Sequence, residues 1–412
     1  MTTPSYVNDN TLVVEVWRSS IVASGSNVAY TPEGELVTTL SVSGEFSFTV
    51  EANGGYWSFS TTLSDNQVNV EEWLMDGLQY NIVVYGESKK RIWEGFVNSI
   101  STQIGGLSVQ RGPLLEIGNR VSCTYARQAI VGNEVVTTSG LTTVIADNDA
   151  SKLKYGIFEK IANAGTVWDN SVAEDIRDTW LNERSEPETT KSFALGGGGA
   201  PSVTIECLGW IHFLGNYIYN ADDVGVGLNV STTISNKIVY VIDGDPLSVA
   251  ANGEPNGLFD AAGGDIDMTN GMLVSRWEDQ NTDAWSIIKD LVSAGDIGGN
   301  RYLFGLYENR KIVYKAMPAT VEYVQRLSDP LQTIMTEGEE IIFPWNVLPG
   351  NWMLFSDFLI GKSQPTDLRL DQRALFIERV AYSTPWGLQL DGGKVHTIEQ
   401  KLAQRGLGLA TA

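Results

Sequence analysis

The amino-acid sequence predicts a β-rich α+β protein. Most of the first 125 residues fall into short segments that alternate apolar and polar residues or are rich in β-branched residues, with Gly, Asn, Asp and Ser breakers between them. Only a few segments further along the chain have the apolar spacing of a helix. Hydrophobic residues make up 42% and aromatic residues 10% of the 412-residue chain, so it can bury sizeable cores and is not mainly disordered.

The N-terminal strands are expected at seven segments. Strands this short and this closely spaced fit a closed barrel or a sandwich, and a barrel would also hide the sheet edges. In chain order the segments are 12–17, 36–40, 46–50, 57–60, 80–85, 91–97 and 119–125.

The pattern changes after residue 126. Ser171 and Glu174 have the spacing of a capping box, and the apolar residues that follow predict a helix at about 171–184. The segment 152–164 carries a similar apolar stripe, but a Tyr-Gly break interrupts it, so a helix and a strand both stay open there. The apolar positions of the first helix are Val172, Ile176, Trp180 and Leu181.

The C-terminal part mixes strands with one clear helix. Thr282 can cap a helix at 283–294, and Gly295 stands where a helix of this length commonly ends. The buried stripe of that helix is expected to be Trp285, Ile288, Leu291 and Val292. Strands are expected at 202–207, 301–307, 311–314, 374–380 and 386–390, with the second and third forming a hairpin.

The charge balance excludes one large class of function. The chain has 28 Lys plus Arg against 50 Asp plus Glu, a net charge of −22, and no basic run. A protein that grips nucleic acid through its phosphates needs the opposite balance, so no specific nucleic-acid binding is expected. The excess is regional, because residues 201–300 carry 14 acids and 3 bases, whereas residues 301–412 carry 12 of each.

Targeting and redox signals are sparse. No window of 18 apolar residues occurs, and the first ten residues lack the basic and apolar regions of a signal peptide. We therefore expect synthesis in a cytoplasm and no membrane span. Cys123 and Cys207 lie in apolar, strand-like runs, so they are expected to be buried free thiols.

Catalytic chemistry is hard to place on this sequence. The two histidines, His212 and His396, lie far apart, and neither stands in a recognisable nucleophile or metal motif. Zinc spacings of the C-x-x-C or H-E-x-x-H type do not occur. We expect no enzyme, no catalytic or metal residue and no cofactor.

Two segments resemble calcium sites and two resemble phosphate-binding loops, but each match is incomplete. The window 243–254 matches the first, third and last positions of an EF-hand, but Leu247 and Ser248 stand where an oxygen ligand and a glycine are needed. Asp260, Asp265 and Asp267 are a second, weaker candidate for calcium. The glycine run 196–199 lacks the Lys-Ser/Thr ending of a phosphate-binding loop, and 361–363 has that ending without the motif's first glycine.

The sequence does not decide whether the chain binds or cleaves sugars. Fifty acids offer many carboxylate pairs for glycoside cleavage, although a solvated surface is the simpler interpretation. Aromatic residues for sugar stacking meet the same ambiguity, and core packing is the favoured interpretation. The tryptophans concerned are Trp73, Trp93, Trp180, Trp210, Trp277 and Trp285.

Several stretches taken together resemble the tail hub or baseplate hub proteins of long-tailed bacteriophages. They are the Arg-Ile-Trp-Glu-Gly-Phe-Val segment at 91–97, the Asn-Arg-Val-Ser-Cys-Thr-Tyr segment at 119–125, and Asp-Ala-Ser at 149–151 followed by Tyr-Gly-Ile at 155–157. In such proteins the first segment closes a barrel, and the third precedes a helix that ends near a proline, here Pro187. The segment 203–210 resembles the strand that returns to a barrel, and the similarity covers about residues 12–210.

The resemblance implies two β-barrel-like domains with a helix-containing insertion. The expected division is an N-terminal barrel domain at 1–125, the insertion at 126–200, return strands at 201–245 and a C-terminal β-rich domain with one helix at 246–412. It also implies a homotrimer that forms a six-fold-like ring in the virion, joining tail-tube or distal tail proteins to a tip or fibre protein.

Two other functions compete with a hub that needs no active site. One is a carbohydrate-binding or cell-wall-cleaving phage tail protein, and the other is a capsid or neck component. If the chain does form a ring around ejected DNA, acids of 201–300 on its lumen would repel phosphates, whereas acids on the outside would only solubilise the surface.

Overall fold

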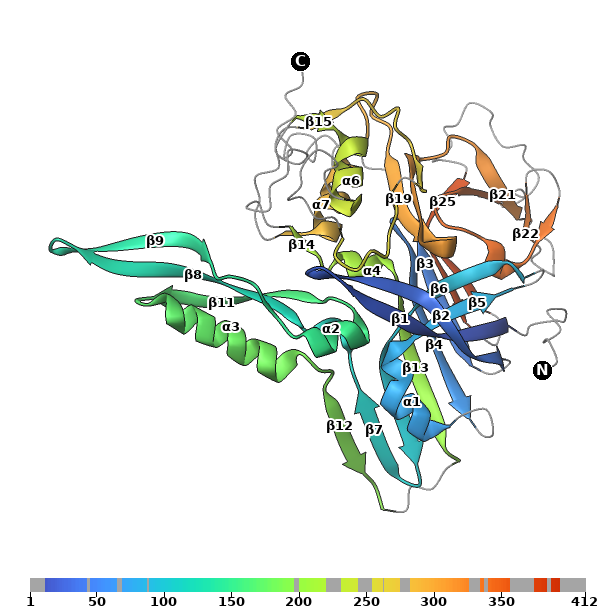
Figure 1. The fold of residues 1–412 in the computed structure, drawn as a ribbon. Helices are drawn as coiled ribbons and strands as arrows, with labels where there is room; N and C mark the ends of the chain where they lie inside the picture. The colour runs from blue at the N-terminus through green and yellow to red at the C-terminus, as the bar shows by residue number, and fades with distance from the viewer. Residues whose placement is uncertain are drawn as a thin grey trace.

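The computed structural model of the chain describes residues 12–42, 45–64, 69–86, 89–195, 200–219, 231–243, 254–261, 263–274, 282–325, 334–336, 340–355, 374–383 and 387–392. Strands dominate these ranges, and helices lie beside them, so the prediction of a β-rich α+β fold is confirmed. A body built on a large mixed sheet carries a long arm on one side and a narrow ribbon below it (Figure 1).

One antiparallel ladder forms the body. Its order is β2, β1, β5, β6, β13, β4, β3 and β25. The strand expected at 202–207 is β13, and it inserts between β6 and β4 although it follows them by about a hundred residues. The bounds are β1 (Leu12–Ser24), β2 (Asn27–Val42), β3 (Phe46–Glu51), β4 (Gly54–Ser64), β5 (Tyr80–Tyr85), β6 (Arg91–Ile104), β13 (Ser202–Gly209) and β25 (Ala374–Ser383).

The ladder does not close into the barrel expected for residues 1–125. Within the described ranges β2 pairs only with β1, and no pairing joins it to β3. The free edge of β3 is taken instead by β25, a strand from the C-terminal part of the chain. The N-terminal sheet therefore continues into the C-terminal strands where a barrel would close on itself.

The C-terminal strands branch from β25. One edge of β25 pairs with β26 (Gly387–Gly392), and the other pairs with β24 (Trp352–Phe355) at its start and with β3 further along. From β24 the sheet continues through β21 (Val321–Gln325), β22 (Ile334–Thr336) and β23 (Ile341–Ile342). A small separate core, which includes Met353, Ile377 and Val380, lies under these strands.

The predicted hairpin at 301–314 is confirmed as β19 (Tyr302–Tyr307) and β20 (Lys311–Ala316). A turn, η6 (Glu308–Arg310), joins the two strands. Helix α7 (Ala284–Ala294) packs on one face of the hairpin, where the Trp285 and Phe304 rings are 6.0 Å apart. Short strands around it are β14 (Ile218–Tyr219), β15 (Thr232–Thr233), β16 (Asp265–Ile266), β17 (Leu273–Val274) and β18 (Thr282–Asp283).

The helix expected at 283–294 is confirmed, with one correction at its start. Asp283, and not Thr282, caps α7, because its carboxylate accepts a hydrogen bond from the Ser286 backbone N–H. Helix α6 (Ile234–Asp243) was not predicted. Its run of Ile and Val suits a strand, and its packing against α7 decides for a helix. The other unpredicted helices are α1 (Val70–Asp76), α4 (Ile211–Leu214), η2 (Gly77–Gln79), η4 (Leu114–Glu116) and η7 (Pro344–Asn346).

The arm consists of a second sheet with a helix on one face. Strand β8 (Arg120–Val131) is central, with β9 (Glu134–Thr142) and β10 (Ala146–Asp147) antiparallel to it and β11 (Glu159–Val167) parallel. The predicted helix at 171–184 is α3 (Asn170–Arg184), but Asp169 caps it where the Ser171 box was expected. The open segment 152–164 resolves into the end of α2 (Asp149–Tyr155) and most of β11, divided at Gly156. The segment 119–125 thus belongs to the arm, and the expected boundary at 125 falls inside β8.

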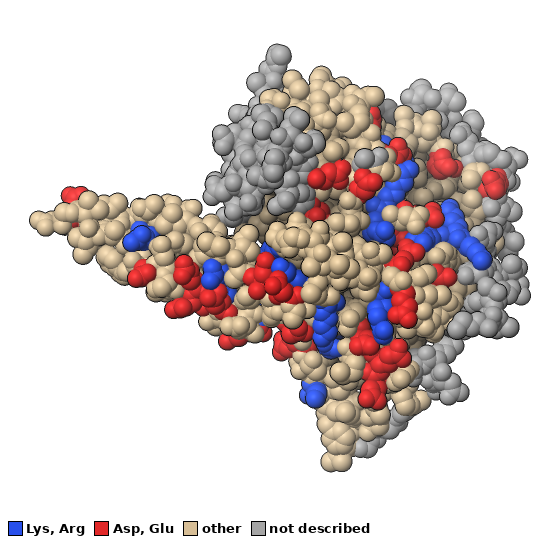
Figure 2. Space-filling view, viewed as in Figure 1, with Lys and Arg blue, Asp and Glu red and all other residues tan. Residues whose placement is uncertain are grey.

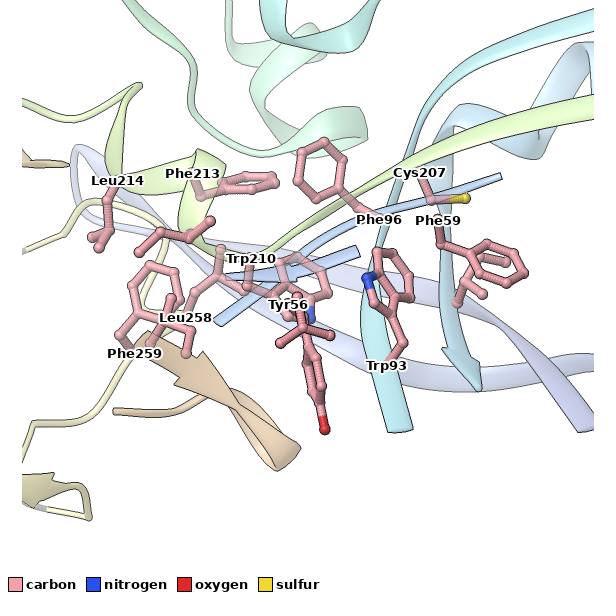
Figure 3. Close-up of a cluster of buried hydrophobic side chains, with 14 of the residues drawn as sticks. Tyr56, Phe59, Trp93, Phe96, Cys207, Trp210, Phe213, Leu214, Leu258 and Phe259 are labelled. Atoms are coloured by element: carbon pink, nitrogen blue, oxygen red, sulfur yellow. The ribbon is translucent and has the colours of Figure 1, made fainter. Parts of the chain in front are cut away.

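Aromatic side chains fill the body between the ladder and the helices (Figure 3). Trp93 and Phe59 lie 5.3 Å apart between centroids, and Phe96 meets Phe213 edge-on at 4.7 Å. A Cβ at Gly209 would collide with the Tyr56 carbonyl, so only glycine lets β13 end this close to β4. Cys207 packs in this core, and the prediction that both cysteines are buried free thiols is confirmed.

A buried carboxylate joins the body to the β19–β20 hairpin. The side chain of Glu94 on β6 is 2% exposed and accepts hydrogen bonds from the Asn309 and Arg310 backbone N–H groups at 3.1 and 2.6 Å. It also pairs with the Arg91 guanidinium at 2.8 Å. Asn309 and Arg310 have φ values of 59° and 57°, a left-handed conformation that costs energy in a non-glycine residue. The Glu94 carboxylate therefore holds a strained turn in place.

We predict that Glu94→Ala lowers the free energy of unfolding by about 3 kcal/mol or more, because it leaves two backbone donors and part of a buried guanidinium without a partner. Urea unfolding followed by tryptophan fluorescence measures this change. The matched control is Glu35→Ala, whose side chain is 74% exposed and pairs with Arg18 only at 3.8 Å, so its effect should stay within about 0.5 kcal/mol. Equal effects of the two substitutions would contradict this account of Glu94.

Candidate interaction surface

Of the two histidines considered for catalysis, the structure describes one, His212. His212 lies on α4 with its ring 4.4 Å from the Trp57 ring, and its Nε2 has no hydrogen-bond partner in the described structure. Burial lowers its pKa to about 4, partly offset by a backbone hydrogen bond with Trp57, so the ring is neutral at pH 7. His396 lies outside the described residues.

The acidic loops weighed for calcium have structural roles where they are described. Asp243 accepts a hydrogen bond from the Ala261 backbone N–H, and buried Glu254 accepts three from Asn256 and Leu258. Asp267 binds Thr269 and the Tyr302 hydroxyl. Across the described residues, no group of three His, Cys, Asp or Glu side chains is placed to hold a metal ion. The middle of the 243–254 window and the glycine motifs at 196–199 and 361–363 lie outside the described residues.

The tryptophans weighed for sugar stacking lie mainly in the core. Trp73, Trp93 and Trp210 are buried, and Trp180 and Trp285 are partly buried against core clusters, which confirms the core-packing interpretation for these five. Trp277 lies outside the described residues. Trp168, which the sequence did not single out, is 56% exposed.

The outer part of the arm is a bare two-stranded ribbon. Strand β11 pairs with β8 only as far as Arg127, so the β8–β9 hairpin extends alone beyond that point. Its apolar side chains face solvent, with Ile130 70% and Val131 63% exposed, and Val135 and Val136 beside them. An isolated two-stranded ribbon is marginally stable in water, and clustered exposed aliphatic residues mark protein–protein contacts. The tip of the arm is therefore the first candidate interaction surface.

A sequence signal for this ribbon was present and was missed. Two β-prone segments, Gln-Ala-Ile-Val and Glu-Val-Val-Thr-Thr, are separated by Gly132 and Asn133. That two-residue Gly-Asn spacing is typical of a β-hairpin. What it does not reveal is that the hairpin projects away from the body.

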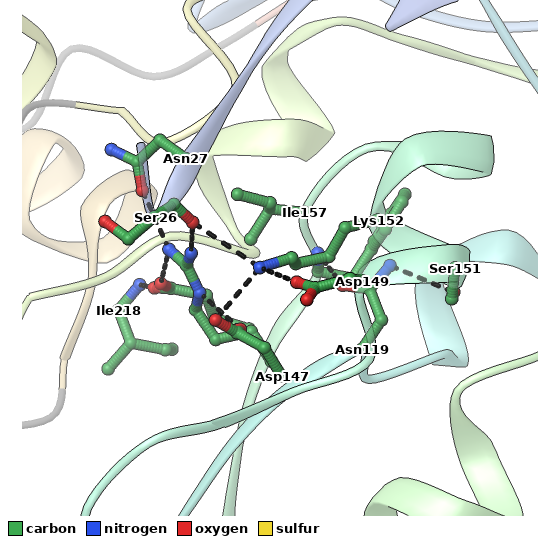
Figure 4. A network of polar contacts seen from close by, with 12 residues as sticks. Ser26, Asn27, Asn119, Asp147, Asp149, Ser151, Lys152, Ile157 and Ile218 are labelled. Carbon is green, nitrogen blue, oxygen red and sulfur yellow. Dashed lines mark hydrogen bonds and ion pairs between the residues drawn. The ribbon is translucent and has the colours of Figure 1, made fainter. Parts of the chain in front are cut away.

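A buried polar network fixes the base of the arm to the β1–β2 hairpin (Figure 4). The Arg120 side chain is 8% exposed and forms ion pairs with Asp147 at 2.9 Å and with Glu159 at 3.2 Å. It also donates hydrogen bonds to Asn27 Oδ1 at 3.0 Å and to the Ser26 carbonyl. Lys152 adds ion pairs of 2.9 Å each to Asp147 and Asp149. Because these partners come from the body and from three elements of the arm, the network sets the direction in which the arm projects.

The face of the arm formed by α3 is acidic. Figure 2 shows Asp and Glu side chains gathered along the lower edge of the arm, with few basic side chains among them. The exposed acids of α3 and its flanks are Asp169, Glu174, Asp175, Asp178, Glu183, Glu186 and Glu188, against Arg177 and Arg184. A partner of the arm on this side would have to be basic.

A second projection lies below the body. Strands β7 (Leu107–Arg111) and β12 (Thr189–Phe193) pair as a ribbon that frames the entry to and exit from the arm. Phe193 is 66% exposed, and Leu195 just beyond it is still more so. In the described part of the chain no helix is both long and apolar enough to cross a bilayer.

Comparisons with known proteins include a distant structural similarity. No protein-family model matches the chain, and no curated protein matches it by sequence. The crystal structure of the tail protein from Neisseria meningitidis MC58 is similar with a TM-score of 0.38 and 8% identity, over 94% of this chain and 99% of that one. A likeness at this level does not define a family, an activity or a partner.

We predict that Arg120→Ala loosens the base of the arm, because it removes the buried guanidinium that joins Asp147 and Glu159 of the arm to Asn27 and the Ser26 carbonyl of the β1–β2 hairpin. Amide hydrogen exchange should rise at residues 26–27, 120–121 and 146–147. Arg127→Ala, an exposed arginine on the same strand, is the matched control and should leave these amides unchanged. Protection in Arg120→Ala equal to that of the wild-type protein would show that the network does not hold the arm.

We also predict a pH dependence from His212. The His212 pKa is about 4 in the folded chain, against 6.5 for an unperturbed histidine. Below pH 6.5 the unfolded chain therefore binds a proton at His212 that the folded chain does not bind. Stability is therefore present above pH 6.5 and falls by about 3 kcal/mol as the pH drops to about 4. His212→Gln should lack this component, and urea unfolding of both proteins between these pH values tests it. Parallel pH profiles for the two proteins would refute the assignment.

Proposed function

We propose that the chain is a structural subunit at the distal end of a phage tail, a tail hub or baseplate hub without catalytic activity. The observation that carries this proposal is the arm, whose outer ribbon exposes Ile130, Val131, Val135 and Val136 to solvent in the single chain. Such a ribbon gains most of its stability only when another subunit covers it. The motifs at 91–97, 119–125 and 149–157, which resemble hub proteins, support the same class.

The proposed assembly is a homotrimeric ring that joins tail-tube or distal tail proteins to a tip or fibre protein. A rigid β-rich body with an arm on one side has unlike faces, and unlike faces that meet head to tail produce a closed ring when the rotation closes.

The net charge of −22 fits a ring through which DNA passes without sticking. Acids of 201–300 are the proposed lining, but not all of them can take part. Glu254 is buried, whereas Glu206 is exposed and accepts a hydrogen bond from Ser99. A carbohydrate-binding tail protein is less well supported, because five of the six tryptophans considered for stacking pack in cores.

The direct test has two parts. Negative-stain images of the purified protein should show rings of three-fold or six-fold appearance, and mass photometry should give three subunits. Gold-labelled antibodies against the chain should bind phage particles at the tail end. Label on the capsid or neck would replace the hub with the competing virion function, and no label on particles would exclude a virion protein.

A further inference from the structure

A cavity of about 370 Å³ opens on the body at the far side from the arm. Three parts of the chain meet there: β4 with the start of β6, the outer face of the β19–β20 hairpin, and the segment 345–351. Its walls are largely apolar and aromatic, including Tyr56, Leu303, Tyr307, Trp345, Leu348 and Pro349. A cavity of this size and lining suits one large apolar group.

The cavity has a cationic rim. Lys90, Lys311 and Lys315 line it and are exposed, and no ion pair joins any of them to a described residue. Lys311 and Lys315 lie on the same face of β20, with Val313 between them in the cavity wall. Arg91 also lines the cavity, but its guanidinium forms ion pairs with Glu33 and Glu94. Among the lining residues Glu308 is the one carboxylate. The cavity thus suits an apolar group flanked by carboxylates.

Trp168 on the arm has this chemistry. It is 56% exposed just after β11. Asp169 follows it and caps α3, Asp178 pairs with Arg177 at 2.7 Å, and Glu174 and Asp175 of α3 are exposed to solvent. The aliphatic residues at the tip of the arm are a poorer match, because Glu134 is the one acid in that ribbon. Exposed Ile297 on the body has a neighbouring acid, Asp296, but that carboxylate is bonded to Asn300.

The chain cannot place Trp168 in its own cavity. Figure 1 shows β11 and the start of α3 on the arm to the left, whereas β6 and β19, which line the cavity, lie on the body. The base of the arm is held by the Arg120 network, so the arm does not fold back. The cavity and Trp168 can meet only between two copies of the chain.

We propose that Trp168 of one copy inserts into the Lys90, Lys311 and Lys315 cavity of the next, with the acids of α3 facing those lysines. The contact is heterologous, because each copy gives its arm to one neighbour and its cavity to another. It deepens the proposed ring by naming the surfaces that form it, and so rests on that proposed function. A buried tryptophan would supply the anchor, and the rim charges would steer and orient the encounter.

Sedimentation of the full chain at several concentrations tests the aromatic anchor and the rim charges separately. Trp168→Ala should weaken self-association roughly thirtyfold, as loss of a buried aromatic anchor does. The double variant Lys311→Glu with Lys315→Glu should weaken it about tenfold or more at low salt and less at high salt. Self-association equal to the wild type in both variants would overturn the proposal, even if rings form.

Two matched controls separate this contact from general loss of stability or charge. Ile297→Ala removes an apolar side chain that lies beside an acid on the body and is still more exposed than Trp168, 80% against 56%. Lys191→Glu with Lys289→Glu makes the same change in net charge at exposed lysines outside the cavity. Both should self-associate as the wild type does, and weakening equal to that of the test variants would count against a specific contact. Circular dichroism of every variant checks that it folds.

A cysteine pair tests the geometry directly. One protein carries Trp168→Cys and a second carries Leu348→Cys, while the native Cys123 and Cys207 stay buried. Oxidation by diamide, which takes the two electrons and two protons of the thiols, should give a disulfide-linked dimer in the mixture and not in either protein alone. Because Trp168→Cys also removes the indole anchor, the mixture is oxidised at a concentration at which Trp168→Ala still self-associates. Absence of the mixed dimer at that concentration overturns the proposal, whereas the tail location is decided independently by gold labelling. A chain that stays monomeric at all concentrations overturns this contact and the ring together.

Discussion

The Glu94 carboxylate is the constraint on which the body depends. It comes from β6 in the middle of the ladder, and its two oxygens bind the backbone of a turn more than two hundred residues further along the chain. A buried carboxylate would be costly without partners, and burial raises the pKa of Glu94 while the bonds from Arg91 and Arg310 oppose that rise. Because each group needs the others, the N-terminal sheet and the β19–β20 hairpin have one relative placement. That placement also forms the cavity between them.

Buried side chains that bond to distant backbone groups also join β2 to the turn at 254–257 and fix the root of the arm. In the buried turn that follows Glu254, the backbone carbonyls of Pro255 and Asn256 accept hydrogen bonds from the Val28 and Tyr30 N–H groups of β2. The Asn256 side chain bonds both backbone groups of Ile157. Asn119 binds Ser151, the Gly156 carbonyl and the Phe158 N–H at the root of the arm. Buried polar groups of this kind add little net stability, but a wrong arrangement leaves them unpaired. They therefore give the molecule a fixed shape, which a subunit of a closed assembly needs.

Surface chemistry divides along the same lines as the fold. Exposed aliphatic and aromatic side chains lie at the tip of the arm, at Trp168 and at the end of β12, and others, such as Ile297, lie on the body. The α3 face of the arm is acidic, and the rim of the cavity is basic. A chain with 50 acids and 28 bases keeps three exposed lysines around one apolar cavity, although its net charge would favour acids there. Complementary surfaces on opposite sides of a rigid body are suited to assembly with copies of the same chain.

The sequence alone determined the features that depend on local periodicity. The β-rich fold class, helix α7, the β19–β20 hairpin, the helix of the arm and the two buried thiols all follow from residue spacing within a dozen positions. Tertiary structure decided which strands pair and which side chains are buried. It placed β13 between β6 and β4 and β25 beside β3, and it turned the Ile- and Val-rich segment at 234–243 into a helix by packing it on α7. Glu94 resembles any polar residue of a strand, and Trp168 resembles Trp93, until the whole chain has folded. Strand partners and burial depend on contacts between residues a hundred or more positions apart, and local patterns do not encode those contacts.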